Sequence, residues 1–132
     1  MRRGELLLEL RLMCKIEPLR RPRWSGKWMY QPKQNQKNLY AALDGFLKEN
    51  KDFERIDGPV VVDMFFMYEK HPRCQYPDMK KYGDLDNLNK AVNDALVSKG
   101  IIQDDRFILA SDSSKQFDDR DYAIIYIYDV ED

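Results

Sequence analysis

The sequence has few of the side chains that bind zinc or form disulfides, with one histidine and two cysteines in 132 residues. Cys14 and Cys74 stand far apart and neither belongs to a CxxC pair, and His71 is the single histidine. Structural zinc sites and disulfide scaffolds need several such residues at defined spacings. The sequence therefore indicates neither, and its cysteine usage fits a reducing cytoplasm.

Long uncharged apolar runs are also missing. The apolar start, MRRGELLLELRLMC, is interrupted by Glu5 and Glu9 and followed by no small-residue cleavage site. We therefore expect neither a secretory signal nor a membrane partner. Hydrophobic residues still make up 43% of the chain and charged residues 34%, which argues against disorder and favours a soluble protein. The length predicts one compact domain, residues 1–132.

A large net charge is absent too, because the formal net charge is −1. This argues against a simple polycationic nucleic-acid binder, yet the charges are unevenly distributed. Residues 1–40 hold ten basic and three acidic side chains, whereas residues 41–132 hold twelve basic and twenty acidic ones. We expect an anion-binding segment and a separate acid-rich surface.

Apolar periodicity predicts the order strand, helix, strand, helix, strand, strand, which indicates an α+β (mixed α/β) fold. Asn38 is the expected cap of the first helix, and Gly100 is the expected stop of the second. The second helix has the strongest signal. The strand candidates are 5–15, 60–69, the short runs 101–102 and 107–109, and the long run 122–130, with the strand at 60–69 central; the expected helices are 39–50 and 87–99.

Residues 17–37 contain three prolines, a glycine and interleaved basic and aromatic side chains, which predicts a long loop or a loosely hairpinned segment. Basic side chains can contact phosphates, and aromatic rings can stack on bases. A folded-down surface loop explains the same composition equally well. The candidate DNA-binding residues here are Arg20, Arg21, Arg23, Lys27, Lys33 and Lys37, with Trp24, Trp28 and Tyr30 for stacking.

Two carboxylates stand one residue apart in GDLDNLNK, where the loop turns into the second helix. Asp86 directly precedes the apolar periodicity, so a helix cap accounts for it. In an extended approach, Asp84 would point to the same side as Asp86. If the segment after the helix is extended, successive side chains point to opposite sides, so only one of Asp104 and Asp105 can join them. Asp94 is a further candidate. The spacing of these residues does not match an EF-hand calcium loop. A cluster of carboxylates offers only oxygen ligands, which suit a hard cation.

The run GDLDNLNKAVNDALVSKGIIQDDRFI resembles the signature of the RusA family of Holliday-junction-resolving endonucleases. That signature reads Asp-x-Asp-Asn-Leu-x-Lys-x-x-x-Asp-Ala-Leu, then about ten residues, then Asp-Asp. The likeness extends from about residue 15 to residue 128. It includes the proline- and arginine-rich segment PLRRPRWSGKWMYQPK, and Lys115 before the last strand resembles a family lysine. Many members have Lys-Pro before the first acid, where this chain has Tyr82-Gly83.

The resemblance implies a RusA-like fold and a crossover junction endodeoxyribonuclease that makes paired nicks in branched DNA during recombination and repair. It assigns Asp84, Asp86 and Asp105 as essential acids and metal ligands and Lys90 as the active-site lysine, with Asp94 and Asp104 as accessory residues. Lys115 joins the DNA-binding set. The implied cofactor is Mg²⁺, with Mn²⁺ as a substitute.

The implied partners are a four-way DNA junction and a second copy of the chain in a homodimer. The implied setting is the cytoplasm of a bacterial or phage-infected cell, in association with the nucleoid. Two alternatives stay open at this point: a junction-binding protein that does not cleave, and an interaction protein whose acids are helix caps and surface charge.

Overall fold

A five-stranded mixed sheet organises the chain in the computed structural model, which describes residues 2–20, 23–30 and 35–131. β4 lies inside the sheet, with β7 antiparallel to it on one side. On its other side, β5 and then β6 pair with β4 in parallel. β1 completes the sheet by pairing antiparallel with β7. The strands are β1 (Arg2–Leu12), β4 (Val60–Glu69), β5 (Ile108–Ala110), β6 (Ser113–Asp118) and β7 (Tyr122–Glu131).

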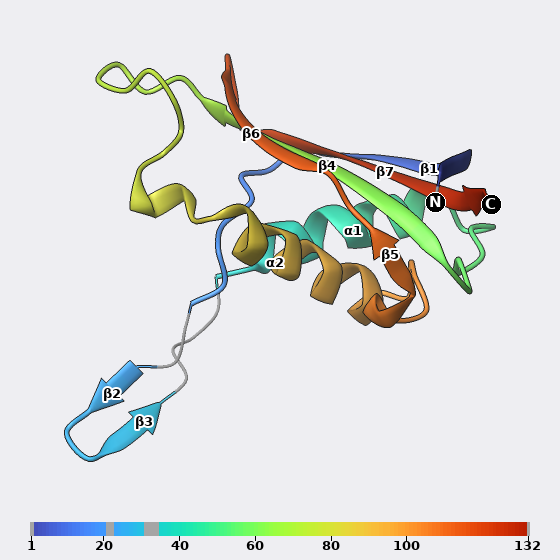
Figure 1. Cartoon of the computed structure of the whole chain (residues 1–132), viewed down its shortest axis with the longest axis horizontal. Coiled ribbons are helices and arrows are strands. Elements are labelled where there is room, and N and C mark those ends of the chain that lie inside the picture. Colours follow the sequence, from blue (N-terminus) through green and yellow to red (C-terminus); the bar gives the residue numbers. More distant parts are fainter. Residues whose placement is uncertain (1, 21–22, 31–34, 132) are drawn as a thin grey trace.

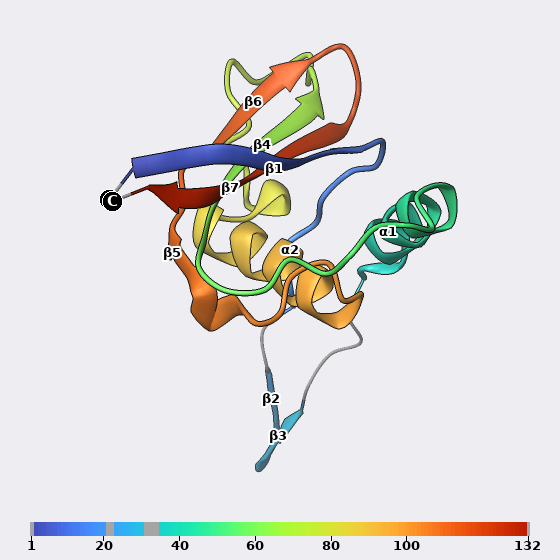
Figure 2. The ribbon, with the colours of Figure 1, turned by 90° about the vertical axis from the view of Figure 1, so that its right-hand side faces the viewer.

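Two helices, α1 (Lys37–Glu49) and α2 (Leu85–Ser98), lie on one face of this sheet (Figures 1 and 2). The alternate β7 residues Ala123, Ile125 and Ile127 are fully buried in the core that the helices and sheet form. The five α2 residues at helical spacing, Leu88, Ala91, Val92, Ala95 and Leu96, are buried as well. This single compact layer of two helices on a mixed sheet confirms the α+β prediction.

The central strand was predicted with its observed bounds, whereas other ends differ. α1 begins at Lys37 with Gln36 at the N-cap position, so the prediction that Asn38 caps this helix is wrong. The Gln36 side chain makes no cap hydrogen bond and donates instead to the carbonyl oxygen of Glu17 at 3.2 Å. β1 begins at Arg2, because pairing with β7 extends past the apolar run to Glu131.

The C-terminal third departs most from the prediction. Ile102 makes only an isolated bridge with Ile56, so the strand expected at 101–102 is not formed. A short 3₁₀ helix, η2 (Asp105–Phe107), precedes β5. β6 was not predicted, because SSKQFD has little β propensity and forms a strand by pairing with the edge of β4. Lys115 therefore lies within a strand.

The basic segment contains a hairpin of β2 (Arg23–Ser25) and β3 (Trp28–Tyr30), with Gly26 at φ +62° in its turn. The hairpin extends away from the sheet on the side of the helices (Figures 1 and 2). We call residues 20–34 the arm. Neither helix in the described ranges has the length and apolarity that a membrane crossing demands.

Candidate active site

The start of α2 is capped by Asp84, not by Asp86 as predicted. The Asp84 carboxylate accepts a hydrogen bond from the backbone N–H of Asn87 at 2.8 Å, three residues further on, which is the usual geometry of an N-cap. Asp86 lies in the first turn and is exposed. Because Leu85 and Asp86 are already helical, the extended geometry that would aim both carboxylates to one side is not present.

The acids that follow α2 form the second half of the candidate site. Asp104 caps η2 by accepting the backbone N–H of Arg106 at 3.2 Å, and Asp105 is the first residue of η2. The Arg106 N–H is the main reason that the pKa of Asp104 lies below its ordinary value. Asp105 is exposed and Asp104 is half-buried. The prediction that only one of these acids joins the site assumed that both lie in an extended strand. Because Asp105 belongs to η2, strand alternation does not apply here.

The charges around Asp105 connect η2 to α2. A hydrogen bond with the Asp104 carboxyl raises the pKa of Asp105, and slight desolvation and the charges of Asp104 and Asp94 act in the same direction. Lys90 opposes this shift. Lys90 also pairs with Asp94 one helical turn on, with 3.3 Å between its ammonium nitrogen and a carboxylate oxygen. Lys90, Asp94, Asp104 and Asp105 thus form one interacting group.

The donor chemistry of these residues fits a hard divalent cation, because every candidate ligand is a carboxylate. After the hydrogen bond with Asp104 and slight desolvation, the charges of Asp104 and Asp94 also contribute to the raised pKa of Asp105, and a bound cation would offset those charges. The predicted ligands are not, however, gathered into one ready-made group. In the described residues, no three His, Cys, Asp or Glu side chains are close enough to hold a metal ion.

Gly83 shows how the chain accommodates its departure from the Lys-Pro pattern. Its φ of +77° and ψ of 173° lie in a region that essentially only glycine adopts, and proline is confined to a φ near −65°. A Cβ at this position would lie 2.6 Å from the Cβ of Pro18. The Gly83 carbonyl oxygen accepts a hydrogen bond from the Lys115 ammonium at 2.7 Å. Pro18 and Lys115 therefore hold the residue before the cap from two sides.

A cleft of about 760 Å³ lies at this place. Its wall combines the segment 18–20 with the loop 78–80, the start of α2 and Lys115 of β6. Arg20, Lys80 and Lys115 give it positive charge next to the carboxylates of Asp78 and Asp84. Lys80 was not singled out in the sequence, because the lysine pair before Tyr82 carries no motif and only the fold brings it here.

The other predicted DNA-binding residues are spread along the arm and α1. Lys37 lines a neighbouring hollow of about 400 Å³ that also includes Asp94. Lys27 is exposed at the turn of the hairpin. The backbone of Arg23 belongs to β2, whereas Arg21 and Lys33 lie outside the described residues. Trp28 is 77% exposed at the hairpin.

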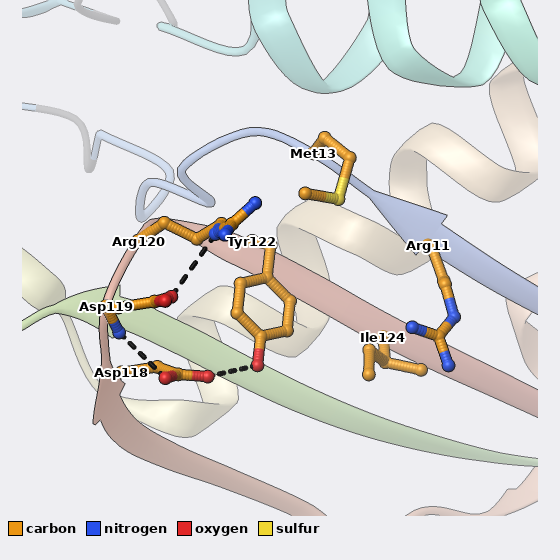
Figure 3. A pocket seen from close by; sticks show the side chains of 7 residues that line it. All are labelled: Arg11, Met13, Asp118, Asp119, Arg120, Tyr122 and Ile124. Atoms are coloured by element: carbon orange, nitrogen blue, oxygen red, sulfur yellow. Dashed lines mark hydrogen bonds and ion pairs between the residues drawn. The ribbon is translucent and has the colours of Figure 1, made fainter.

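A separate hollow of about 300 Å³ is lined by Arg11 of β1, Ile124 of β7 and the turn between β6 and β7 (Figure 3). Its polar groups are already paired: Tyr122 donates to Asp118, and Arg120 lies 3.2 Å from Asp119. The Asp118 hydrogen bond raises the pKa of Tyr122. None of the predicted site residues lines this hollow, so the cleft beside Asp84 is the stronger candidate.

A protein-family model matches most of the chain. The model of the family "Endodeoxyribonuclease RusA" matches residues 15–128, which is most of the 132 residues. The matched range includes the arm, the cleft, both groups of acids and Lys115. No curated protein matches the sequence significantly.

Gly83→Ala is expected to lower the free energy of unfolding by about 1–3 kcal/mol, because it combines a φ that disfavours a side chain with a clash against Pro18. Urea denaturation measures this change. Gly58→Ala is the matched control, because Gly58 also has a positive φ, +83°, but nothing lies within 4 Å of its added Cβ. Equal losses in the two variants would show that contact with Pro18 is unimportant.

Proposed function

Because the chain belongs to the RusA endodeoxyribonuclease family, we propose that it resolves four-way DNA junctions by Mg²⁺-dependent, paired nicks in strands of like polarity. The family acts on branched DNA, and its members are Holliday junction resolvases. The observation that carries the proposal is the position of the family signature in the fold. It starts at a helix cap that opens onto a basic cleft, and its last acid returns beside Lys90 and Asp94.

Asp84, Asp86 and Asp105 are the residues proposed to hold Mg²⁺, or Mn²⁺ in its place. When bound, the cation supplies an activated water and stabilises charge on the phosphate oxygens. Asp86 and Asp105 are exposed, so their side chains have room to turn towards a shared ion. Asp104 and Asp94 place further negative charge near Asp105, which a cation bound there would neutralise.

Lys90 is proposed to stabilise the negative charge that develops on the phosphate. Its ion pair with Asp94 is exposed on both sides, and such pairs contribute little to stability. A phosphate oxygen can therefore replace Asp94 as the partner of the ammonium group at small cost. The N-terminal end of α2 adds a favourable electrostatic field for a phosphate nearby.

DNA is proposed to enter along the arm and the cleft. Arg20, Lys80 and Lys115 line the cleft and offer charge to phosphates, which position a duplex without reading its sequence. In the hairpin of the arm, the exposed Trp28 is available to stack on bases where DNA strands separate, and Lys27 precedes it in the chain.

The chain is also proposed to act as a homodimer. A four-way junction has two strands of like polarity to cut, and one monomer holds a single set of the signature residues. Two copies related by a two-fold axis are the simplest way to present two equivalent sites to these strands.

Replacing the acids tests the enzymatic proposal. Wild-type protein with Mg²⁺ is expected to convert a mobile four-way junction into two nicked duplexes. Asp84→Asn, Asp86→Asn and Asp105→Asn remove one carboxylate charge each and are expected to abolish cleavage. Lys90→Ala is expected to lower the rate by about 10²–10³-fold, as loss of a charge-stabilising donor does. Gel electrophoresis of labelled junctions measures the products.

Asp52→Asn is the control for these variants, because Asp52 is exposed in the turn after α1, outside the signature. It should cleave like the wild type. Junction binding without nicks by the wild-type protein would favour the alternative of a non-cleaving junction-binding protein.

Mg²⁺ binding is expected to stabilise the fold independently of cleavage. At about a hundred times its dissociation constant, the cation adds about 2.7 kcal/mol and raises the melting temperature by several degrees. In Asp105→Asn the shift should be lost.

Potassium chloride at matched ionic strength is the control for the thermal scans, since it screens charge without occupying the site. Coincident curves with Mg²⁺ and with potassium chloride would contradict the shared metal site.

The solution mass tests the homodimer. Light scattering during gel filtration is expected to give twice the chain mass of 15.8 kDa. A mass of 15.8 kDa, both free and bound to a junction, would contradict paired cutting by two copies.

A further inference from the structure

The described residues on either side of the arm, 16–19 before it and 35–36 after it, meet at one place. On the leaving side, the Gln36 side chain donates to the Glu17 carbonyl oxygen at 3.2 Å, and Asn35 donates to the Glu17 carboxylate. On the entering side, the Tyr68 hydroxyl donates to the carbonyl oxygen of Ile16 at 2.8 Å in the core. We call residues 16–19, together with Asn35 and Gln36, the base of the arm.

Asn87 joins this base to the start of α2 through both polar atoms of its side chain. Its Oδ1 accepts the backbone N–H of Leu19 at 2.9 Å, and its Nδ2 donates to the carbonyl oxygen of the same residue at 2.9 Å. The contact is specific for an amide, because a carboxylate accepts but cannot donate and an aliphatic side chain does neither. Its backbone N–H meanwhile makes the cap bond to Asp84.

Leu19 therefore sits at a fixed place relative to the candidate metal ligands. Its neighbour Pro18 lies against Gly83, one residue before the cap, and its other neighbour Arg20 lines the cleft. The arm begins directly after this contact. A side chain of the signature thus joins the start of α2 to the base of the arm.

We propose that Asn87 is a positioning residue that clamps the base of the arm to the start of α2, so that phosphates held by the arm lie in register with Asp84 and Asp86. This inference rests on the proposed function, since it assigns the clamp a role in DNA binding. Asn87 itself does not touch the reacting phosphate. Without the clamp, the arm keeps its basic side chains, but its direction relative to α2 is no longer fixed.

The test compares Asn87→Ala with Asn89→Ala in the full chain. Asn89 is two residues further along the same helix, occupies a variable position of the signature, and donates to the Ser113 hydroxyl at 3.1 Å. Three quantities are measured: hydrogen exchange of the Leu19 amide, the dissociation constant for a four-way junction in EDTA, and its dependence on potassium chloride.

In Asn87→Ala the Leu19 amide is expected to exchange about tenfold faster, as the loss of a hydrogen bond requires. Junction binding is expected to weaken about tenfold. The slope of the logarithm of the binding constant against the logarithm of the salt concentration is expected to become shallower, by the amount that about one or two lost phosphate contacts would cause. Asn89→Ala is expected to stay within about twofold of the wild type in both binding and Leu19 exchange.

The backbone cap bond to Asp84 is unchanged by either alanine, so Mg²⁺ stabilisation should persist in both. If Asn87→Ala does not fold, Asn87→Asp replaces it. Aspartate keeps the acceptor for the Leu19 N–H and loses the donor to the Leu19 carbonyl. Asn89→Asp adds the same charge to the same helix and is its control, and weaker junction binding by Asn87→Asp than by Asn89→Asp is expected.

An unchanged Leu19 exchange rate would overturn the clamp. Faster exchange with unchanged affinity and salt slope would overturn the positioning role while leaving the proposed function intact. A wild-type protein that neither binds nor cuts a junction overturns the proposed function instead, and with it the DNA role of Asn87, although Leu19 exchange would still report the clamp.

Discussion

The paired hydrogen bonds between the Asn87 side chain and the Leu19 backbone join the segment before the arm to the start of α2, where the candidate site lies. They bring a chain segment from the basic first third onto a helix that begins with acids. Once Leu19 is fixed there, Pro18 must pass close to residue 83, and that closeness leaves no room for a Cβ. The same pass places Arg20 in the cleft beside Asp84. Asn87 thus holds the segment that contributes Pro18, Leu19 and Arg20 to the cleft.

The mixture of charges in this cleft answers the conflict that any nuclease of this kind faces. Acids that bind a cation repel the phosphate backbone, and bases that attract the backbone would neutralise the acids if they paired with them strongly. In the cleft, Arg20 from the basic first third lies with Lys80 and Lys115 beside the carboxylates of Asp78 and Asp84. The contact that Lys90 makes with Asp94 is exposed and weak. The pKa of Asp105, in turn, is raised first by its hydrogen bond with the Asp104 carboxyl and by slight desolvation; the charges of Asp104 and Asp94 act in the same direction, and Lys90 opposes them. In the proposed function, a cation would neutralise the acids and a phosphate would take the place of Asp94 beside Lys90.

The sequence predicted the features that depend on local pattern. The central strand 60–69 and the apolar face of α2 follow from alternation and helical spacing, and both were found. Features that depend on distant pairing were missed: β6 is a strand only because β4 offers it an edge, and Gln36 holds the cap position of α1 while its side chain bonds to Glu17. The cap was assigned to Asp86 instead of Asp84, because apolar periodicity starts one turn later than the helix itself. The sequence pattern indicates neither the position of Lys80 in the cleft nor the contact between Leu19 and Asn87.

The Tyr82-Gly83 departure is also explained by contacts that lie far apart in sequence. A proline before Asp84 would fix its approach through a closed ring, and glycine removes that restraint. Here the restraint comes from elsewhere: Pro18 packs on Gly83, Lys115 holds its carbonyl oxygen, and its N–H bonds to the Lys80 carbonyl oxygen at 3.0 Å. The Tyr82 ring is buried 4.7 Å from that of Tyr68, centroid to centroid, and Tyr68 in turn anchors Ile16. A proline ring at position 83 would forbid the φ of +77° and remove the N–H, so in this chain glycine is the residue that permits a rigid approach to the cap.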